Sequence, residues 1–354
     1  MNILYVFDHT PNGSSLYRLW ALERLGHRII ALNSGDYQSR NSMVRKLVHR
    51  IVAGPAVNRL NRDILKLAER EKPDILWADK VLWMQRMTLE RLRAMGIVTL
   101  SYMMDNPFGT RQDPGWRLYV KNIEHYDLNV VPREKSVADY IAKGSKNVIK
   151  IQFAYEPTIH YPPSAGWSDK DRDRAVSFIG TPYDHRAEFL TRLWKEFGFP
   201  VSVSGGLVWK SALGCEASAA IYRGNGELYG DEYREGIWKS RINLSFITHS
   251  NQDEFAHKSF EIAGAGGFLL AERSAGHLQY FKEGEEAVFF STIEECAEQI
   301  RRYLPDEDAR KRIAAAGYER AVRGGYHNDR QMGLVVERVQ AILENRRETS
   351  AGRR

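Results

Sequence analysis

The sequence predicts an α/β protein with two Rossmann-like domains, each built on a doubly wound parallel sheet. Short apolar runs at residues 2–7 and 27–32 flank a segment with helical apolar spacing at residues 16–25. Strand, helix and strand in this order form a parallel sheet, and continuous apolar strands are covered on both faces. The pattern starts again at residues 176–181, and 354 residues are enough for two hydrophobic cores.

The expected domain boundaries follow changes in composition. Residues 1–155 form the first domain, and residues 156–174, which are rich in proline and other turn residues, form a linker. Residues 175–330 form the second domain. A helix over residues 331–345 is expected to pack back toward the first domain. Residues 346–354 lack an apolar face and are expected to be a frayed tail.

The composition is that of a globular protein with a positive balance, since the formal net charge is +6 and the pI is about 9.1. This charge favours anionic ligands or surfaces. The basic residues are spread along the chain without a nucleic-acid-binding module, so no nucleic-acid partner is expected. Two distant cysteines indicate neither a disulfide framework nor a metal cluster. Without a signal-peptide pattern or a spanning apolar run, we expect a cytoplasmic protein.

Residues 43–52 form a basic amphipathic segment. Met43, Leu47 and Ile51 fall on one helical face, and Arg45 and Arg50 lie largely on the other. Such a helix can rest on anionic lipid headgroups, which would place the protein peripherally on the inner face of a membrane. It can equally dock its apolar face on its own domain. The sequence leaves both interpretations open.

The stretch 251–272 carries the densest set of functional residue types. Its acids, Asp253, Glu254 and Glu261, lie in a polar loop and a short helix, together with His257 and Lys258. A turn of small residues at 263–267 lets the backbone approach another group closely, and a buried strand follows. Backbone N–H groups and a lysine at a helix N-terminus suit a diphosphate, and carboxylates accept hydrogen bonds from sugar hydroxyls.

This stretch resembles the C-terminal half of GT-B glycosyltransferases of the group-1, family-4-like type, and most closely the CgeB-like spore-maturation branch. The shared order is a basic residue, Phe-Glu, a small-residue turn and a strand, which appear here as Lys258, Phe260-Glu261, 263–267 and 268–270. The resemblance continues through 283–290. It implies the GT-B fold, in which the two domains face each other across a cleft, with the donor on the second domain and the acceptor on the first.

The resemblance implies a set of donor-side residues. The family carries an acid followed after seven residues by a glutamate, a spacing that Asp253 and Glu261 have, with Glu254 as a neighbouring candidate for the first acid. The structural alternative for Glu261 is a helix-face pair with Lys258. The other donor-binding candidates are Lys258, His257, Arg186, Gly180, Thr181 and Tyr229.

On the first domain, Gly13, Ser14 and Ser15 resemble the loop that opens the acceptor half of these enzymes. Asp105 follows a strand predicted at residues 97–102, where it either orients an acceptor hydroxyl and takes its proton or caps a proline turn. The family often has His-Asp at this position, and here Met104 precedes the aspartate.

The implied function is transfer of a sugar from a nucleoside-diphosphate sugar to a glycan, glycolipid or other hydroxyl acceptor, as in polysaccharide biosynthesis, with retention of configuration. The Asp-x-Asp at residues 171–173 lies in the charged linker rather than in a strand–loop setting, so we expect no cofactor and no metal. The alternatives are a nucleotide-sugar epimerase on the same scaffold and a catalytically degenerate nucleotide-sugar-binding protein.

Overall fold

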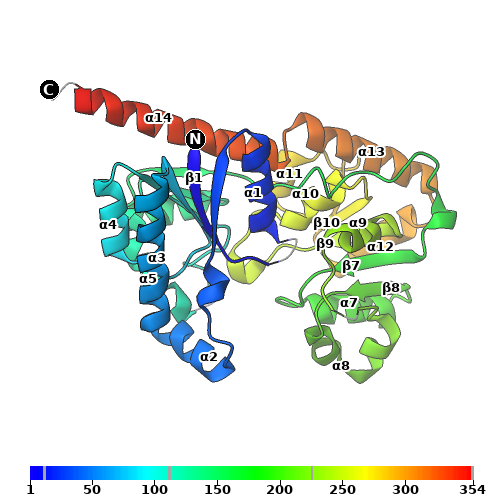
Figure 1. Ribbon diagram of the computed structural model, residues 1–354. Helices are drawn as coiled ribbons and strands as arrows, with labels where there is room; N and C mark the ends of the chain where they lie inside the picture. The colour runs from blue at the N-terminus through cyan, green and yellow to red at the C-terminus, as the bar shows by residue number, and fades with distance from the viewer. Residues whose placement is uncertain (11–12, 111–112, 225, 352–354) are drawn as a thin grey trace. The chain divides into compact units, whose positions relative to one another are not determined.

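The computed structural model describes residues 1–10, 13–110, 113–224 and 226–351 (Figure 1). The chain divides into two compact units. Unit 1 comprises residues 1–152 and the chain from Asn328 onward, and unit 2 comprises Phe153–His327. The expected boundaries at 155 and 330 therefore differ from the observed ones by three residues each.

Unit 1 is built on one parallel sheet with the strand order β2-β1-β3-β4-β5-β6. Its strands are β1 (Asn2–Phe7), β2 (Arg28–Asn33), β3 (Ile75–Asp79), β4 (Val98–Tyr102), β5 (Leu128–Val131) and β6 (Val148–Lys150). Its α-helices are α1 (Ser14–Arg24), α2 (Ser42–Ile51), α3 (Pro55–Glu71), α4 (Arg86–Ala94), α5 (Arg117–Asn122), α6 (Glu134–Ala142) and α14 (Asn328–Ala351). Short 3-10 turns are η1 (Ser34–Tyr37), η2 (Pro114–Trp116) and η3 (Ile123–His125).

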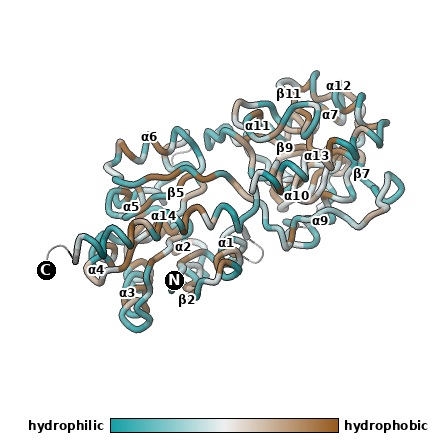
Figure 2. The backbone as a smooth tube through the Cα atoms, turned by 90° about the horizontal axis from the view of Figure 1, so that it is seen from above, coloured by the Kyte–Doolittle hydropathy of each residue, from teal (hydrophilic) through white to brown (hydrophobic). Residues whose placement is uncertain are grey.

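Both faces of this sheet are covered, as its apolar strands require. Alternate side chains of β1 point to opposite faces, so that Ile3 and Tyr5 join one core and Leu4 and Val6 the other. The first core includes residues of α1 and α14, and the second includes residues of α3 and α4. In Figure 2 the hydrophobic colour follows β5 and recurs along α14.

Unit 2 repeats the architecture with the strand order β11-β10-β9-β7-β8, again all parallel. The strands are β7 (Arg174–Ile179), β8 (Val201–Ser204), β9 (Ser240–Ser245), β10 (Leu269–Glu272) and β11 (Val288–Phe290). The helices are α7 (Arg186–Lys195), α8 (Val208–Ile221), α9 (Gly230–Trp238), α10 (His257–Gly264), α11 (Ala275–Tyr280), α12 (Ile293–Tyr303) and α13 (Glu307–Arg323), with the 3-10 turns η4 (Asp169–Asp171) and η5 (His249–Asn251).

Most of the segment expected to be a linker packs on unit 2, and we refer to residues 153–173 as the strap. A side chain at Gly264 would lie 2.6 Å from the Tyr155 ring, and one at Gly266 would lie 2.9 Å from Pro162. The indole of Trp238 donates to the Tyr161 carbonyl at 2.9 Å. The small-residue turn thus permits a close approach as predicted, but the group that approaches is the strap.

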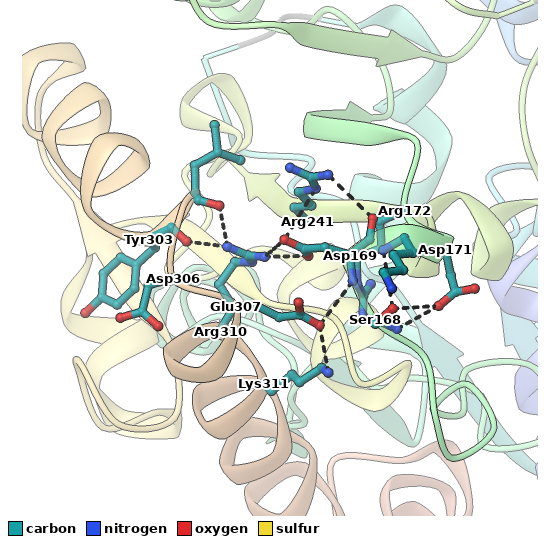
Figure 3. A network of polar contacts seen from close by, with 12 residues as sticks. Ser168, Asp169, Asp171, Arg172, Arg241, Tyr303, Asp306, Glu307, Arg310 and Lys311 are labelled. Atoms are coloured by element: carbon teal, nitrogen blue, oxygen red, sulfur yellow. Dashed lines mark hydrogen bonds and ion pairs between the residues drawn. The ribbon is translucent and has the colours of Figure 1, made fainter.

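A network of ion pairs and hydrogen bonds fastens the end of the strap (Figure 3). The buried Arg310 of α13 donates from Nη2 to both carboxylate oxygens of Asp169, at 2.5 and 2.6 Å. Its Nη1 donates to the carbonyls of Tyr303 and Leu304. Arg241 contacts Asp169 from the start of β9 at 3.6 Å. The strap, β9 and α13 are therefore joined through one carboxylate.

The C-terminal helix is longer than expected. α14 runs from Asn328 to Ala351 and packs on α1, where Asp329 pairs with Arg24 at 2.5 Å. Arg346 donates to Asp127 at 2.5 Å, so the tail expected to fray from residue 346 is helical through residue 351. Residues 352–354 of that expected tail lie outside the described residues.

We expect Arg310→Ala to destabilise the protein by about 3–5 kcal/mol, because it leaves the Asp169 carboxylate without its main partner. Arg323→Ala is the matched control, since it removes an exposed pair with Glu319 worth less than about 1 kcal/mol. Urea unfolding of the full chain, followed by tryptophan fluorescence, measures both. Equal midpoints for the two variants would show that the Asp169 pair contributes no more than a surface pair.

Candidate functional site

The carboxyl edge of the unit 2 sheet gathers most of the predicted donor residues. The strand order reverses at β7, because β8 lies on one side of it and β9 on the other. Ligands of open parallel sheets bind at such a switch point, beyond the carboxyl ends of the strands. Gly180 and Thr181 follow β7 directly, and residues 246–248 follow β9.

Arg186, at the start of α7, holds these two loops together. Its guanidinium donates to the Thr181 carbonyl at 3.2 Å, the Ile247 carbonyl at 3.1 Å and the Thr248 hydroxyl at 2.9 Å. Burial lowers the pKa of Arg186, while Asp184, Glu272 and Asp253 raise it. Within the described part of the chain, its buried Nε has no hydrogen-bond partner. Arg186 thus has a structural contact set, and its predicted donor role stays a prediction.

The N-terminus of α10 is fixed by a buried histidine. His277 of α11 donates from Nδ1 to the Glu272 carbonyl at 2.7 Å. Its Nε2 lies 3.1 Å from the Ala256 amide and 2.9 Å from the Ser259 hydroxyl, both of which donate to it. Burial lowers the pKa of His277 to about 4, so it is neutral at physiological pH. This arrangement sets the position of the helix that carries Lys258 and Glu261.

Glu261 lies at the centre of a charged cluster. Its Oε2 accepts from the Tyr233 hydroxyl at 2.8 Å, and its Oε1 lies 3.7 Å from Nε2 of His257. Burial raises the pKa of Glu261, but His257, His160, Lys258 and the Tyr233 hydroxyl outweigh this effect and lower the pKa to about 2. The carboxylate is therefore ionised throughout the physiological range.

Lys258 lies over the end of β7. Its Cε would lie 2.7 Å from a Cβ at Gly180, so any larger residue there would displace the lysine side chain. The ammonium donates to the Tyr233 hydroxyl at 3.4 Å and lies 4.7 Å from the centre of that ring. Among the described residues, Tyr233 thus bridges Lys258 and Glu261 in place of a direct ion pair. Burial lowers the pKa of Lys258, and Glu261 opposes this shift.

Two members of this cluster were not predicted from the sequence. Tyr233 is one helical turn beyond Tyr229 on α9. Tyr229 is the residue that we expected near the donor, but its hydroxyl contacts the Glu227 carboxylate, and it is partly exposed. His160 comes from the strap, packs edge-on against Tyr233 and has its pKa lowered to about 4 by burial. Turn-rich composition gave no signal that this segment contributes to a site.

The two acids proposed for the donor sugar lie in the loop before α10. The Asp253 carboxylate accepts a hydrogen bond from the side-chain amide of Asn251 at 3.2 Å. The Glu254 carbonyl accepts from the Ser274 hydroxyl at 2.7 Å, and a side chain at Gly276 would lie 2.2 Å from it. The loop backbone is therefore fixed against the start of α11, with both side chains only partly buried.

Unit 1 has a cavity of about 350 Å³ at the carboxyl edge of its own sheet. Gly13, Ser14 and Ser15 line it, as does Lys80, which follows β3 in a left-handed conformation with φ 55°. Lys80 Nζ lies 2.5 Å from Oδ2 of Asp105, which follows β4. The predicted acceptor loop is thus part of a cavity, and the lysine that pairs with Asp105 was not predicted.

A buried ion pair supports this loop from below. Arg18 of α1 donates to both oxygens of Asp79 at 2.7 Å, and the Ser15 hydroxyl donates to the same carboxylate at 3.1 Å. The Tyr5 hydroxyl donates to it as well, at 2.5 Å. Asp79 is fully buried, so these four hydrogen bonds replace its hydration and position the first turn of α1.

The described residues contain no group of three or more histidine, cysteine or acidic side chains placed to hold a metal ion. In the same part of the chain, no helix combines the length and apolar character needed to cross a bilayer.

Comparison with solved structures identifies the fold. The chain has the GT-B fold. HepE of Anabaena, in complex with UDP, matches at a TM-score of 0.63 with 10% identity, covering 96% of this chain and 100% of that one. Sucrose-phosphate synthase from Thermosynechococcus elongatus matches at 0.67 with 12% identity, covering 97% and 100%. A trehalose-6-phosphate synthase, studied for glycosyl transfer with retention, matches at 0.63 with 12% identity, covering 96% and 99%.

At the level of sequence, the match is confined to one region. The family described as glycosyl transferase-like matches residues 185–337, less than half of the chain. No curated protein sequence matches. The matched region contains Glu261, Lys258, Asp253 and Tyr233. The predicted GT-B architecture is confirmed, whereas the CgeB-like branch and the roles of individual residues stay predictions.

We predict that stability falls in acid because of His277. The folded protein holds this group neutral down to a pKa of about 4, whereas its ordinary pKa is 6.5. Its contribution is therefore full above pH 6.5 and is lost toward pH 4, by about 3 kcal/mol in total. His277→Gln should lower stability at pH 7.5 and flatten the loss between pH 6.5 and 4.5.

Thermal unfolding across this pH range measures the slope, and His185→Gln is the control because the His185 side chain is 93% exposed. An unchanged slope in His277→Gln would assign the acid sensitivity to other groups, such as His160.

Proposed function

We propose that this chain is a GT-B glycosyltransferase of the group-1 type, CgeB-like branch, which transfers a hexose from a nucleoside-diphosphate sugar to a hydroxyl acceptor on a glycan or lipid. The ionised Glu261 at the carboxyl edge of unit 2, beside Lys258 and the start of α10, carries the proposal. The glycosyl transferase-like match over residues 185–337 supports it.

The Glu261 carboxylate is suited to accept hydrogen bonds from the ribose hydroxyls of the donor. The carboxylate is charged and only 13% exposed, and the Tyr233 hydroxyl occupies its Oε2. Hydrogen bonds between hydroxyls and a charged acceptor contribute more than neutral ones, about 1.5–3 kcal/mol each. Asp253 and Glu254, in the fixed loop before α10, would accept from hydroxyls of the transferred sugar. The HepE neighbour is a UDP complex, so a uridine donor is the first to test.

The cations at the carboxyl edge of the unit 2 sheet are suited to bind the leaving diphosphate. Transfer develops negative charge on the diphosphate, and fixed positive groups lower the barrier by neutralising it. Lys258 lies over Gly180, and the N-terminus of α10 adds the positive end of the helix dipole. Arg186 donates to the Thr181 carbonyl from beneath that loop. His257, the first residue of α10, donates to the Ala154 carbonyl of the strap. A reaction with these groups needs no metal.

We place the acceptor hydroxyl in unit 1. Asp105 lies at the carboxyl edge of the sheet, 2.5 Å from Lys80, where its carboxylate could orient a hydroxyl or accept its proton. The cavity lined by Gly13, Ser14 and Ser15 is the place where the acceptor would lie. Retention of configuration is proposed from the group-1 resemblance and from the trehalose-6-phosphate synthase neighbour, which was studied for glycosyl transfer with retention. We place the reaction in polysaccharide or glycolipid synthesis in the cytoplasm.

Thermal shift with UDP-, GDP-, ADP- and dTDP-sugars in EDTA tests the donor site. A ligand that binds only the folded state raises the melting temperature, so one base class should stabilise the wild type. Glu261→Gln should lose most of that shift, with Kd weaker by roughly tenfold or more, since the amide replaces a charged acceptor.

Glu319→Gln, an exposed glutamate on α13, should keep the wild-type shift. If no nucleotide sugar shifts the wild type with or without Mg²⁺, the donor site is misassigned. A shift without product release in any acceptor mixture would favour the degenerate binding protein.

Asp105→Asn should lower turnover by roughly 10²-fold or more while leaving the donor-induced thermal shift unchanged, because general bases contribute on this scale. The measurement is nucleoside-diphosphate release from the stabilising donor, with a lipid extract as the source of acceptor. Glu69→Gln, an exposed acid on α3, is the control. Wild-type turnover in Asp105→Asn would restrict Asp105 to the Lys80 pair.

A further inference from the structure

Helix α2 displays its apolar residues to solvent. The exposed fractions are 75% for Met43, 44% for Val44, 56% for Leu47 and 57% for Ile51, and no residue of the helix is buried. Of the two interpretations that the sequence left open, docking of this face on its own domain is therefore wrong. Figure 1 shows α2 at an extremity of unit 1, away from the sheet.

The opposite face of α2 attaches it to the unit. His49 Nε2 lies 2.6 Å from Asp113, and its ring packs against Gly115 of η2. Leu47 and Ile51 are each two residues from His49, which places them about 160° around the helix axis from it. The apolar stripe therefore points away from unit 1. The Asn41 side chain accepts from the amides of Met43 and Val44 and caps the helix without any core contact.

Cations border this stripe. Arg50, which was expected largely on the opposite face, lies about 20° from Met43 on the helical wheel, and Lys46 lies about 60° from Met43. Helix α2 contains no acidic residue. Beneath the helix, a cavity of about 910 Å³ is lined by Arg45, Lys46, His49, Arg50 and Arg117. Its lining includes one acid, Asp113, which pairs with His49. The surface thus combines an exposed apolar stripe with concentrated positive charge.

We propose that α2 lies on a bilayer that carries anionic lipids, with Met43, Leu47 and Ile51 at the acyl boundary and Lys46 and Arg50 among the headgroups. Charge complementarity favours this occupant, because such a helix binds through apolar area and through attraction to anionic lipids together. A symmetric contact with a second copy would instead bring two sets of cations together at one apolar stripe, which repulsion disfavours.

The contact would bring lipid close to the acceptor cavity. The cavity beneath α2 and the one at the Ser14 loop share Gln38, Arg45 and His49 in their linings, so the two are adjacent within unit 1. A lipid with an anionic headgroup in the first cavity would place its distal sugar or hydroxyl toward the second. The acceptor class inferred here, an anionic glycolipid or lipid phosphate, rests on the proposed function, whereas the membrane contact does not.

Flotation of the full chain with phosphatidylcholine vesicles, with and without 30% phosphatidylglycerol, tests the contact. We expect binding to the anionic vesicles only, and a decline as salt screens the charges. Leu47→Ser with Ile51→Ser should lower the bound fraction at least tenfold. Lys46→Gln with Arg50→Gln should lower it roughly fivefold per cation removed.

Met87→Ser with Ile141→Ser is the matched control, since these apolar residues of unit 1 are 61% and 58% exposed outside α2. Wild-type binding by the Leu47/Ile51 variant, or an absence of wild-type binding, would overturn the proposal. So would a dimer in light scattering that the Leu47/Ile51 variant abolishes, because a second copy would then cover the face. Donor binding in lipid-free buffer tests the proposed function separately.

Discussion

The candidate donor site depends on the charge of Glu261. A buried carboxylate is tolerated only where neighbouring groups replace its hydration. Here those groups come from separate segments: His160 from the strap, Tyr233 from α9, and His257 and Lys258 from α10. The contacts that keep the carboxylate ionised therefore also hold the strap, α9 and α10 at the switch point of the sheet. Fold stability and ligand chemistry share one set of interactions in unit 2.

The sequence was sufficient to predict both parallel sheets, because apolar runs at strand spacing and helical periodicity are local signals. The strap could not be predicted, since its turn-rich composition shows that it forms no regular element but not where it packs. Tyr155 and Pro162 find their places only because Gly264 and Gly266 leave room for them. The predicted close approach at the small-residue turn was therefore correct, while its partner, a segment about 100 residues earlier, was beyond any local signal.

The site was predicted in part for the same reason. Gly180 and Lys258, two of the predicted donor residues, lie next to each other, because the order of the elements brings the turn after β7 to the start of α10. Tyr233, one helical turn beyond Tyr229, could not be found from the sequence, because the side that α9 presents to α10 depends on packing. Lys80 was missed for lack of a motif: only the positions of β3 and β4 side by side bring it to Asp105.

The cations that give the chain its net positive charge lie in two different kinds of environment. In unit 2, Arg186 is buried and Lys258 is partly buried at the sheet edge, where desolvation lowers the pKa of each and a bound anion would raise it again. In unit 1, Arg50 and Arg117 line an open, solvated cavity, where attraction is weaker and falls with salt. The first environment suits one tightly held phosphate group, and the second suits many weak contacts with a charged surface. A donor diphosphate and an anionic lipid differ in this same way, so two kinds of cation site are what an enzyme that uses both would need.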